Sequence, residues 1–136
     1  MAEAGILQAL RGVIEAEPTI RVAYLFGSCA RGDAGPTSDV DVALLADQPI
    51  DLSELAAIGT RIGTVVERVV DVVDLRAAAP LLCREVVGEG ELLAVRDPLL
   101  RFDFEQEAVR RCEDTRRLRA QQQQLLRERR AHGRST

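Results

Sequence analysis

The sequence predicts a single α/β domain whose chain closes with one long helix. Three observations lead to this prediction. Short runs rich in Val, Ile and Leu, typical of buried strands, alternate with segments whose apolar residues recur at helical spacing. From Pro98 onward no helix-breaking residue occurs until Gly133. At 136 residues the chain has room for one hydrophobic core.

The composition is that of a folded globular protein with an aliphatic core. Hydrophobic residues make up 46% of the chain and charged residues 29%, whereas Trp is absent and only one Tyr and three Phe occur. No stretch approaches the roughly 20 apolar residues that cross a bilayer, and the start lacks the pattern of a signal peptide. We therefore expect a cytoplasmic protein. The three cysteines stand at wide, irregular spacings, which fits neither a disulfide framework nor a zinc site.

The first half of the chain is predicted to begin with a helix and two strands. Apolar residues at helical spacing predict a helix over residues 3–16, which Pro18 ends. The β-branched and aromatic run 20–26 is predicted to be a buried strand. Residues 31–38 contain two Gly and one Pro and are predicted to be a loop. A second strand over 39–46 is expected to pair antiparallel with the first, because the connection between them is short and made of small residues.

The second half is predicted to contain three helices and two further strands. A helix begins after Asp51 or Ser53, either of which can cap it. A valine-rich strand follows at 69–75, then a helix at 78–87 and a short strand at 91–95. The long helix after Pro98 completes the chain.

The long helix carries a charge opposite to that of the rest of the chain. Residues 1–109 hold 9 Arg and 19 acidic residues, a net charge of −10, whereas residues 110–136 hold 9 Arg and 3 acidic residues, a net charge of +6. The apolar stripe of the helix weakens after Leu118, so its end should be solvated or frayed unless a partner covers it. The helix is therefore a candidate contact surface, and a homo-oligomer formed through it stays open.

Two aspartates at the start of the second strand indicate a metal site. Asp39 and Asp41 are one residue apart, so on a strand their side chains share one face. Their like charges repel each other, and a cation bound between them would remove that penalty. Carboxylates with an open outer side suit Mg²⁺, which takes further ligands from water and from substrate phosphates.

A third acidic residue can complete this site if the third strand lies beside the second. Asp71 is flanked by valines, where an unpaired carboxylate would be costly. Asp74 is the alternative, but it falls on the opposite face of the strand and near its end, where it could cap the next helix. We favour Asp71 as the third carboxylate.

Three residues between the first two strands are suited to bind phosphate. Gly27 allows the backbone to approach a phosphate closely. Ser28 offers a hydroxyl group and an amide donor at the same point. Arg31 is the nearest cation that can bind phosphate oxygens in a bidentate manner. Together they predict a nucleotide-binding turn beside the carboxylates.

These residues together resemble the signature of a known enzyme superfamily. Gly27-Ser28, ten intervening residues and Asp39-x-Asp41 reproduce the pattern Gly-Ser-x10-Asp-x-Asp of nucleotidyltransferases with a DNA polymerase β-like fold. Segments 27–33 and 38–41 are similar to those of the small single-domain branch, the minimal nucleotidyltransferase (MNT) family. Residues 70–75 resemble the strand that carries that family's third carboxylate.

The resemblance covers about residues 20–95 and implies a domain division and a fold. We assign residues 1–97 to a minimal nucleotidyltransferase domain and residues 98–136 to its C-terminal helix and tail. The implied fold is a small mixed sheet with helices packed on one side.

The resemblance also implies a reaction and a role for each carboxylate. An MNT protein transfers a nucleoside monophosphate, here expected to be AMP from ATP, and releases pyrophosphate. Asp39 and Asp41 would hold the metal ions, expected to be two Mg²⁺, that bridge the triphosphate. Asp71 would act as a metal ligand beside the acceptor and as the base for its hydroxyl group. Gly27 and Ser28 would contact the triphosphate.

Many MNT proteins are antitoxins that adenylylate a tyrosine of a HEPN-family ribonuclease toxin, so the resemblance implies such a toxin as the partner. Two alternatives stay open: transfer to a small molecule such as an aminoglycoside, and a non-enzymatic antitoxin that occludes its partner through the long helix. Nucleic-acid binding is disfavoured, because the Arg-rich tail has no aromatic residues and the rest of the chain is acidic.

Overall fold

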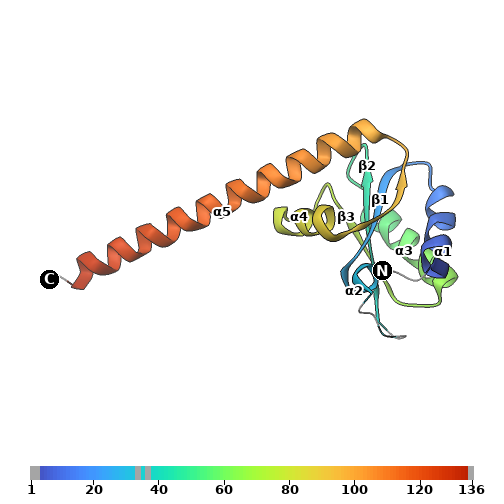
Figure 1. Ribbon diagram of the computed structural model, residues 1–136, viewed down its shortest axis with the longest axis horizontal. Coiled ribbons are helices and arrows are strands. Elements are labelled where there is room, and N and C mark those ends of the chain that lie inside the picture. Colours follow the sequence, from blue (N-terminus) through green and yellow to red (C-terminus); the bar gives the residue numbers. More distant parts are fainter. Residues whose placement is uncertain (1–3, 33–34, 36–37, 135–136) are drawn as a thin grey trace.

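The computed structural model describes residues 4–32, 35 and 38–134 as one mixed sheet surrounded by helices. Along the chain the elements are α1 (Ala4–Glu15), β1 (Ile20–Phe26), α2 (Gly27–Arg31), β2 (Val40–Ala46), α3 (Leu52–Val66), β3 (Val70–Asp74), α4 (Pro80–Glu89), β4 (Glu91–Val95) and α5 (Pro98–Arg134). The strand order is β3-β2-β1-β4 (Figure 1). β1 pairs antiparallel with both β2 and β4, and β2 pairs parallel with β3. The predicted mixed sheet and the antiparallel first pair are therefore confirmed.

Helices cover both faces of the sheet, so the expectation that they pack on one side is wrong. α1 and α3 pack on one face through Leu10, Ile14, Ile58 and Ile62. α4 and α5 cover part of the other face through Cys83, Val86 and Ala108. The physical reason is that six of the seven residues in each of β1 and β2 are buried, which makes both faces of these strands apolar. Each apolar face must be shielded from water, so helices pack on both.

The short helix α2 occupies the turn where only a tight backbone reversal was expected. Gly27 at its start and Gly32 after its end both have positive φ, 73° and 79°. Cys29 anchors the helix because its side chain is buried, and its thiol donates to the Asp39 carbonyl oxygen over 3.5 Å. A five-residue helix is too short to show a hydrophobic period, which is why the pattern did not reveal it. Residues 33, 34, 36 and 37 of the predicted loop lie outside the described residues.

The other predicted elements are confirmed with small shifts at their ends. The strands predicted at 20–26 and 91–95 have those bounds in the structure. Asp51 is the residue that precedes α3, although its side chain makes no capping hydrogen bond. All three cysteines are buried, as expected for small apolar thiols.

The helix α5 runs unbroken for 37 residues and leaves the body of the molecule after its first half (Figure 1). Leu100, Phe104 and Ala108 pack it against the sheet, and Cys112 is the last buried residue among those whose burial the structure describes. Every residue from 116 to 131 is exposed, and we call this segment the arm. In the part of the chain that the structure describes, no helix combines the length and apolar content needed to cross a bilayer.

A buried tyrosine ties α5 to the centre of the sheet. The Tyr24 hydroxyl of β1 donates to Glu105 Oε1 over 2.8 Å, and Arg101 Nε donates to the same oxygen over 2.9 Å. Burial, and then the hydrogen bond to the charged Glu105 carboxylate, raise the pKa of Tyr24 above its ordinary range. The phenol therefore stays neutral and holds the base of α5 at a defined angle to β1.

We expect Tyr24→Phe to lower the free energy of unfolding by about 1 kcal/mol, because Glu105 keeps its pair with Arg101. A pKa raised in the folded state means that the tyrosine's contribution is complete below its unfolded pKa of about 10 and is lost as pH rises above that value. Urea unfolding between pH 8 and 11 should therefore show a steeper alkaline loss for the wild type than for Tyr24→Phe. Parallel curves would contradict this account.

Candidate active site

The register between β2 and β3 sets two of the predicted carboxylates side by side. Asp41 is the direct partner of Asp71 in the parallel pair. Paired residues on neighbouring strands project from the same face, which is the face that α4 and α5 cover further along. Asp39 lies just before β2, and both it and Asp71 are exposed, whereas Asp41 is half-buried. The expectation that the third strand lies beside the second is therefore confirmed.

The charges around Asp41 make its ionised form costly. Partial burial raises the pKa of Asp41, and the neighbouring charges of Asp71, Asp39 and Glu85 raise it further. The Arg31 guanidinium acts in the opposite direction but is the smallest of these influences. The site is a cluster of like charges, which a bound cation would stabilise.

The carboxylate oxygens of this cluster are suited to supply some of the ligands of a Mg²⁺ ion. Carboxylate oxygens are the ligands this ion prefers, and it keeps places for water and substrate phosphates. Among the described residues, no three acidic, His or Cys side chains are gathered closely enough to form a metal-binding group by themselves. The protein thus offers separate carboxylates on one face, and the phosphates of a nucleotide could join them into one site.

Asp74 lies on the opposite face and has a different part in the structure. It pairs with Leu44 across the strands and is only 6% exposed. Its two carboxylate oxygens accept hydrogen bonds from the backbone amides of Ile50 and Arg76, each at 3.0 Å. Asp74 therefore holds together the turns that follow β2 and β3.

Gly27 lies in contact with the Asp41 carboxylate. Its neighbour Phe26 is the direct partner of Asp41 in the antiparallel pair, so the chain enters α2 beside that side chain. A Cβ atom on Gly27 would stand 2.3 Å from Asp41 Oδ2, and this distance is too short for any side chain at position 27. Ser28 follows in the first turn of α2, where backbone amides have no partner within the helix. The predicted nucleotide-binding turn and the carboxylates therefore meet at one point.

Helix α4 brings two further acidic residues close to the site. Glu89 Oε2 lies 3.8 Å from Arg31 Nη1, and the charge of Glu85 reaches Asp41. These two glutamates are four residues apart and so share one face of α4. No sequence pattern pointed to them, because only the packing of α4 beside α2 brings them near Asp41.

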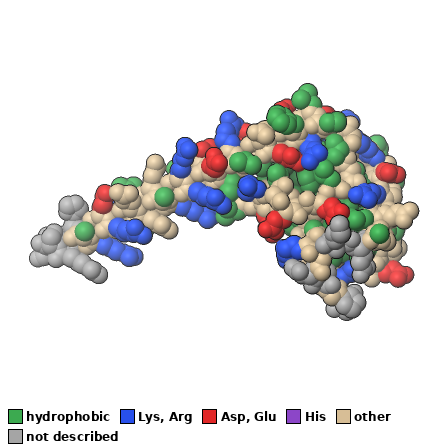
Figure 2. Space-filling view, viewed as in Figure 1, with side chains coloured by type: hydrophobic (Ala, Val, Ile, Leu, Met, Phe, Trp, Pro, Cys, Tyr) green, Lys and Arg blue, Asp and Glu red, His purple; other side chains and the backbone are tan. Residues whose placement is uncertain are grey.

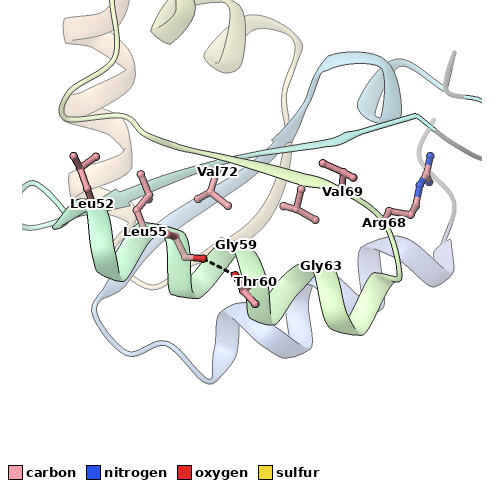
Figure 3. A pocket seen from close by; sticks show the side chains of 10 residues that line it. Leu52, Leu55, Gly59, Thr60, Gly63, Arg68, Val69 and Val72 are labelled. Atoms are coloured by element: carbon pink, nitrogen blue, oxygen red, sulfur yellow. Dashed lines mark hydrogen bonds between the residues drawn. The ribbon is translucent and has the colours of Figure 1, made fainter.

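A cavity of about 440 Å³ lies between α3 and β3, away from the carboxylates of the candidate site (Figure 3). Its lining includes Leu52, Gly59, Gly63 and Val69, and none of the predicted site residues. Gly59 lets α3 approach β3, since a Cβ atom there would stand 3.2 Å from Val72 Cγ2. This cavity belongs to the face opposite the carboxylates and is separate from them.

The sequence is similar to known nucleotidyltransferases. The family model described as "Polymerase beta, Nucleotidyltransferase" matches residues 8–99. The protein adenylyltransferase MntA of Shewanella oneidensis is 35% identical over 88 residues, which make up 65% of this chain and 61% of that protein. The chain therefore matches somewhat less than two thirds of that relative's length.

Solved structures of toxin–antitoxin complexes share the fold over most of the chain. A crystal structure of a toxin–antitoxin with AMP-PNP contains a chain that superposes with a TM-score of 0.72 at 28% identity, with 90% of this chain and 96% of that chain covered. A crystal structure of the toxin–antitoxin MntA–HepT gives a TM-score of 0.66 at 26% identity, with 90% and 95% covered. Since the family match spans about two thirds of the sequence and includes the Gly27-Ser28 turn and all three predicted carboxylates, this chain belongs to the polymerase β nucleotidyltransferase family.

Proposed function

We propose that this chain is an Mg²⁺-dependent protein adenylyltransferase that transfers AMP from ATP to a tyrosine hydroxyl of a HEPN-family toxin, and so acts as its antitoxin. The observation that carries the proposal is the pairing of Asp41 with Asp71 beside Asp39 and next to Gly27. The similarity to a protein adenylyltransferase and to a complex with AMP-PNP, an ATP analogue, supports both the reaction and the nucleotide.

Asp39, Asp41 and Asp71 would hold two Mg²⁺ ions in this proposal. Bound metal ions supply charge neutralisation for the triphosphate and for the attacking and leaving oxygens of an in-line displacement. Gly27 leaves room for a phosphate against the backbone, and Ser28 donates to a phosphate oxygen from its hydroxyl and amide groups. Arg31, which is exposed and close to the site, would bind a phosphate oxygen with its guanidinium group.

Asp71 would take the proton of the acceptor. As the tyrosine oxygen bonds to the α-phosphorus, the bond to the pyrophosphate oxygen breaks and the hydroxyl proton passes to the Asp71 carboxylate. Asp71 is suited to this role because it is exposed and lies on β3, an edge strand of the sheet. A hydroxyl group carried by a second protein could reach it. We assign the chemistry to residues 1–97 and contact with the partner to residues 98–136.

The test is the transfer of label from α-labelled ATP to a HEPN-family toxin. Wild-type protein should label the toxin with Mg²⁺, and EDTA should abolish the labelling until Mg²⁺ is restored. Asp71→Asn should lower the rate by about 100-fold or more, because it removes the base. Asp74→Asn is the matched control: it should lower the free energy of unfolding by about 1–3 kcal/mol and keep the labelling rate below its unfolding temperature.

Two results would contradict the proposal. One is undiminished labelling by Asp71→Asn or in EDTA. The other is full neutralisation of the toxin, with no gain of AMP by intact mass, which would show that the chain silences its partner by occlusion.

A further inference from the structure

The arm of α5 is a long, exposed and positively charged surface. Its residues, 116–131, include six Arg and a single acidic residue, Glu128, which gives a net charge of +5. Residues 1–109 comprise the sheet domain and the beginning of α5, and they have a net charge of −10. Figure 2 shows the arm extending from the body with Arg side chains along it. One molecule thus presents two surfaces of opposite sign.

Four of these arginines form a stripe on the side of α5 that faces the body. Arg116, Arg119, Arg127 and Arg130 follow the buried Cys112 at 4, 7, 15 and 18 residues, and these spacings return to the same face of a helix. Cys112 points at α4, and Arg116 lines a groove of about 400 Å³ between the two helices. We call these four residues the basic stripe. The basic stripe lies on the same side of α5 as the residues that pack against α4, and it extends along the arm.

The groove joins the basic stripe to the carboxylate site. Its α4 wall contains Glu85 and Glu89. The charge of Glu85 reaches Asp41, and Glu89 lies 3.8 Å from Arg31, which the proposed function places at the nucleotide. A protein seated along the stripe and groove would therefore reach the site from the side of α4.

We propose that the basic stripe and the groove between α4 and α5 form the docking surface of the acceptor protein, which contacts the stripe through an acidic surface. This inference rests on the proposed function for the identity of the acceptor. Opposite charges attract the acidic surface to the arm, while the acidic body repels it, so the pair of surfaces sets the orientation of the complex. Leu126, which is 52% exposed and follows Cys112 by 14 residues, adds apolar contact beside the stripe.

Features of the arm favour a protein over a nucleic acid as its partner. No Phe, Tyr or Trp follows Phe104, so the arm lacks these aromatic side chains, on which the bases of a single strand stack most strongly. Four consecutive glutamines, residues 121–124, interrupt the arginines in the middle of the arm. A nucleic acid carries phosphates along its whole length, so those that reached the groove would meet Glu85 and Glu89, whereas a protein can place its acidic residues on the stripe alone.

The test compares two charge-reversal variants with the same net charge. Arg119→Glu/Arg127→Glu changes the basic stripe, whereas Arg110→Glu/Arg117→Glu places the same charges on the opposite side of α5. Binding of the same HEPN-family toxin is measured by calorimetry without ATP. We expect the stripe variant to raise the Kd by about 100-fold and the control by less than about 3-fold. The KM for the toxin should rise with the Kd, while kcat and the KM for ATP stay unchanged.

Other results would overturn the docking surface. Equal losses in the two variants, or none in the stripe variant, would show that the stripe does not face the toxin. A wild-type dimer in sedimentation that the stripe variant loses would assign the surface to a second copy of this chain. Retention of RNA by the wild type and not by the stripe variant would assign it to nucleic acid. A toxin that binds through the stripe yet gains no AMP would refute the proposed function and leave the docking surface standing.

Discussion

Asp41→Asn is expected to abolish AMP transfer and at the same time to make the metal-free protein more stable. The loss of activity should be about 1000-fold or more, because the side chain is the half-buried member of the proposed metal site. The gain in stability follows from the crowded charges. Burial, Asp71, Asp39 and Glu85 all disfavour the ionised form of Asp41, and Asn removes that ionised group.

The difference in stability between the wild type and Asp41→Asn should depend on pH. The pKa of Asp41 is raised in the folded state, so the metal-free protein is most stable below the unfolded pKa of the group and loses stability as pH rises through the folded pKa. The unfolding temperature of Asp41→Asn should exceed that of the wild type at pH 7, and the difference should shrink toward pH 4. Adding Mg²⁺ should stabilise the wild type and leave Asp41→Asn nearly unchanged, because a ligand stabilises only the state that binds it.

The matched control is Asp103→Asn, which makes the same change at an exposed residue of α5. It should alter neither labelling nor the response to Mg²⁺. A wild type that is more stable than Asp41→Asn at pH 7 without metal would show that the carboxylates do not repel one another as the geometry requires.

Gly27→Ala is expected to lower activity by about 100-fold or more and to destabilise the fold. A φ of 73° costs a residue with a Cβ atom about 1–2 kcal/mol relative to Gly. The added methyl group would stand 2.3 Å from Asp41 Oδ2, so the carboxylate must move. Displacing a reacting group by about 1 Å can cost about two orders of magnitude in rate. Thermal unfolding and the labelling assay measure the two effects separately.

Gly12→Ala is the matched control for this substitution. Gly12 lies within α1, and a Cβ atom there has no neighbour within 4 Å. Because Ala is the better helix former by about 1 kcal/mol, this variant should be more stable than the wild type and equally active. Normal stability and full activity in Gly27→Ala would refute the close contact between this turn and the carboxylate.

The elements of the fold and the chemical groups of the site could be predicted from the sequence. Local periodicity placed the strands and long helices within a few residues, because burial on one face leaves its period in the sequence. The Gly27-Ser28 turn and the Asp39-x-Asp41 pair could also be predicted, since only ten residues separate Ser28 from Asp39 in the connection between neighbouring strands, which brings them to one end of the sheet. The nearly continuous apolar runs of β1 and β2 also indicate a cover on both faces, although the resemblance led us to expect helices on one side only.

How distant segments meet depends on the packing of the whole molecule and could not be predicted from local patterns. The pairing of Asp41 with Asp71 depends on α3 carrying the chain across one face of the sheet, and a shift of one residue in that register would turn Asp71 to the other face. The approach of Glu85 and Glu89 to the site depends on α4 packing beside α2. The position of the basic stripe depends on the angle that the Tyr24–Glu105 hydrogen bond gives to α5. These contacts join residues 30 to 81 positions apart, and no local period encodes a contact between such segments.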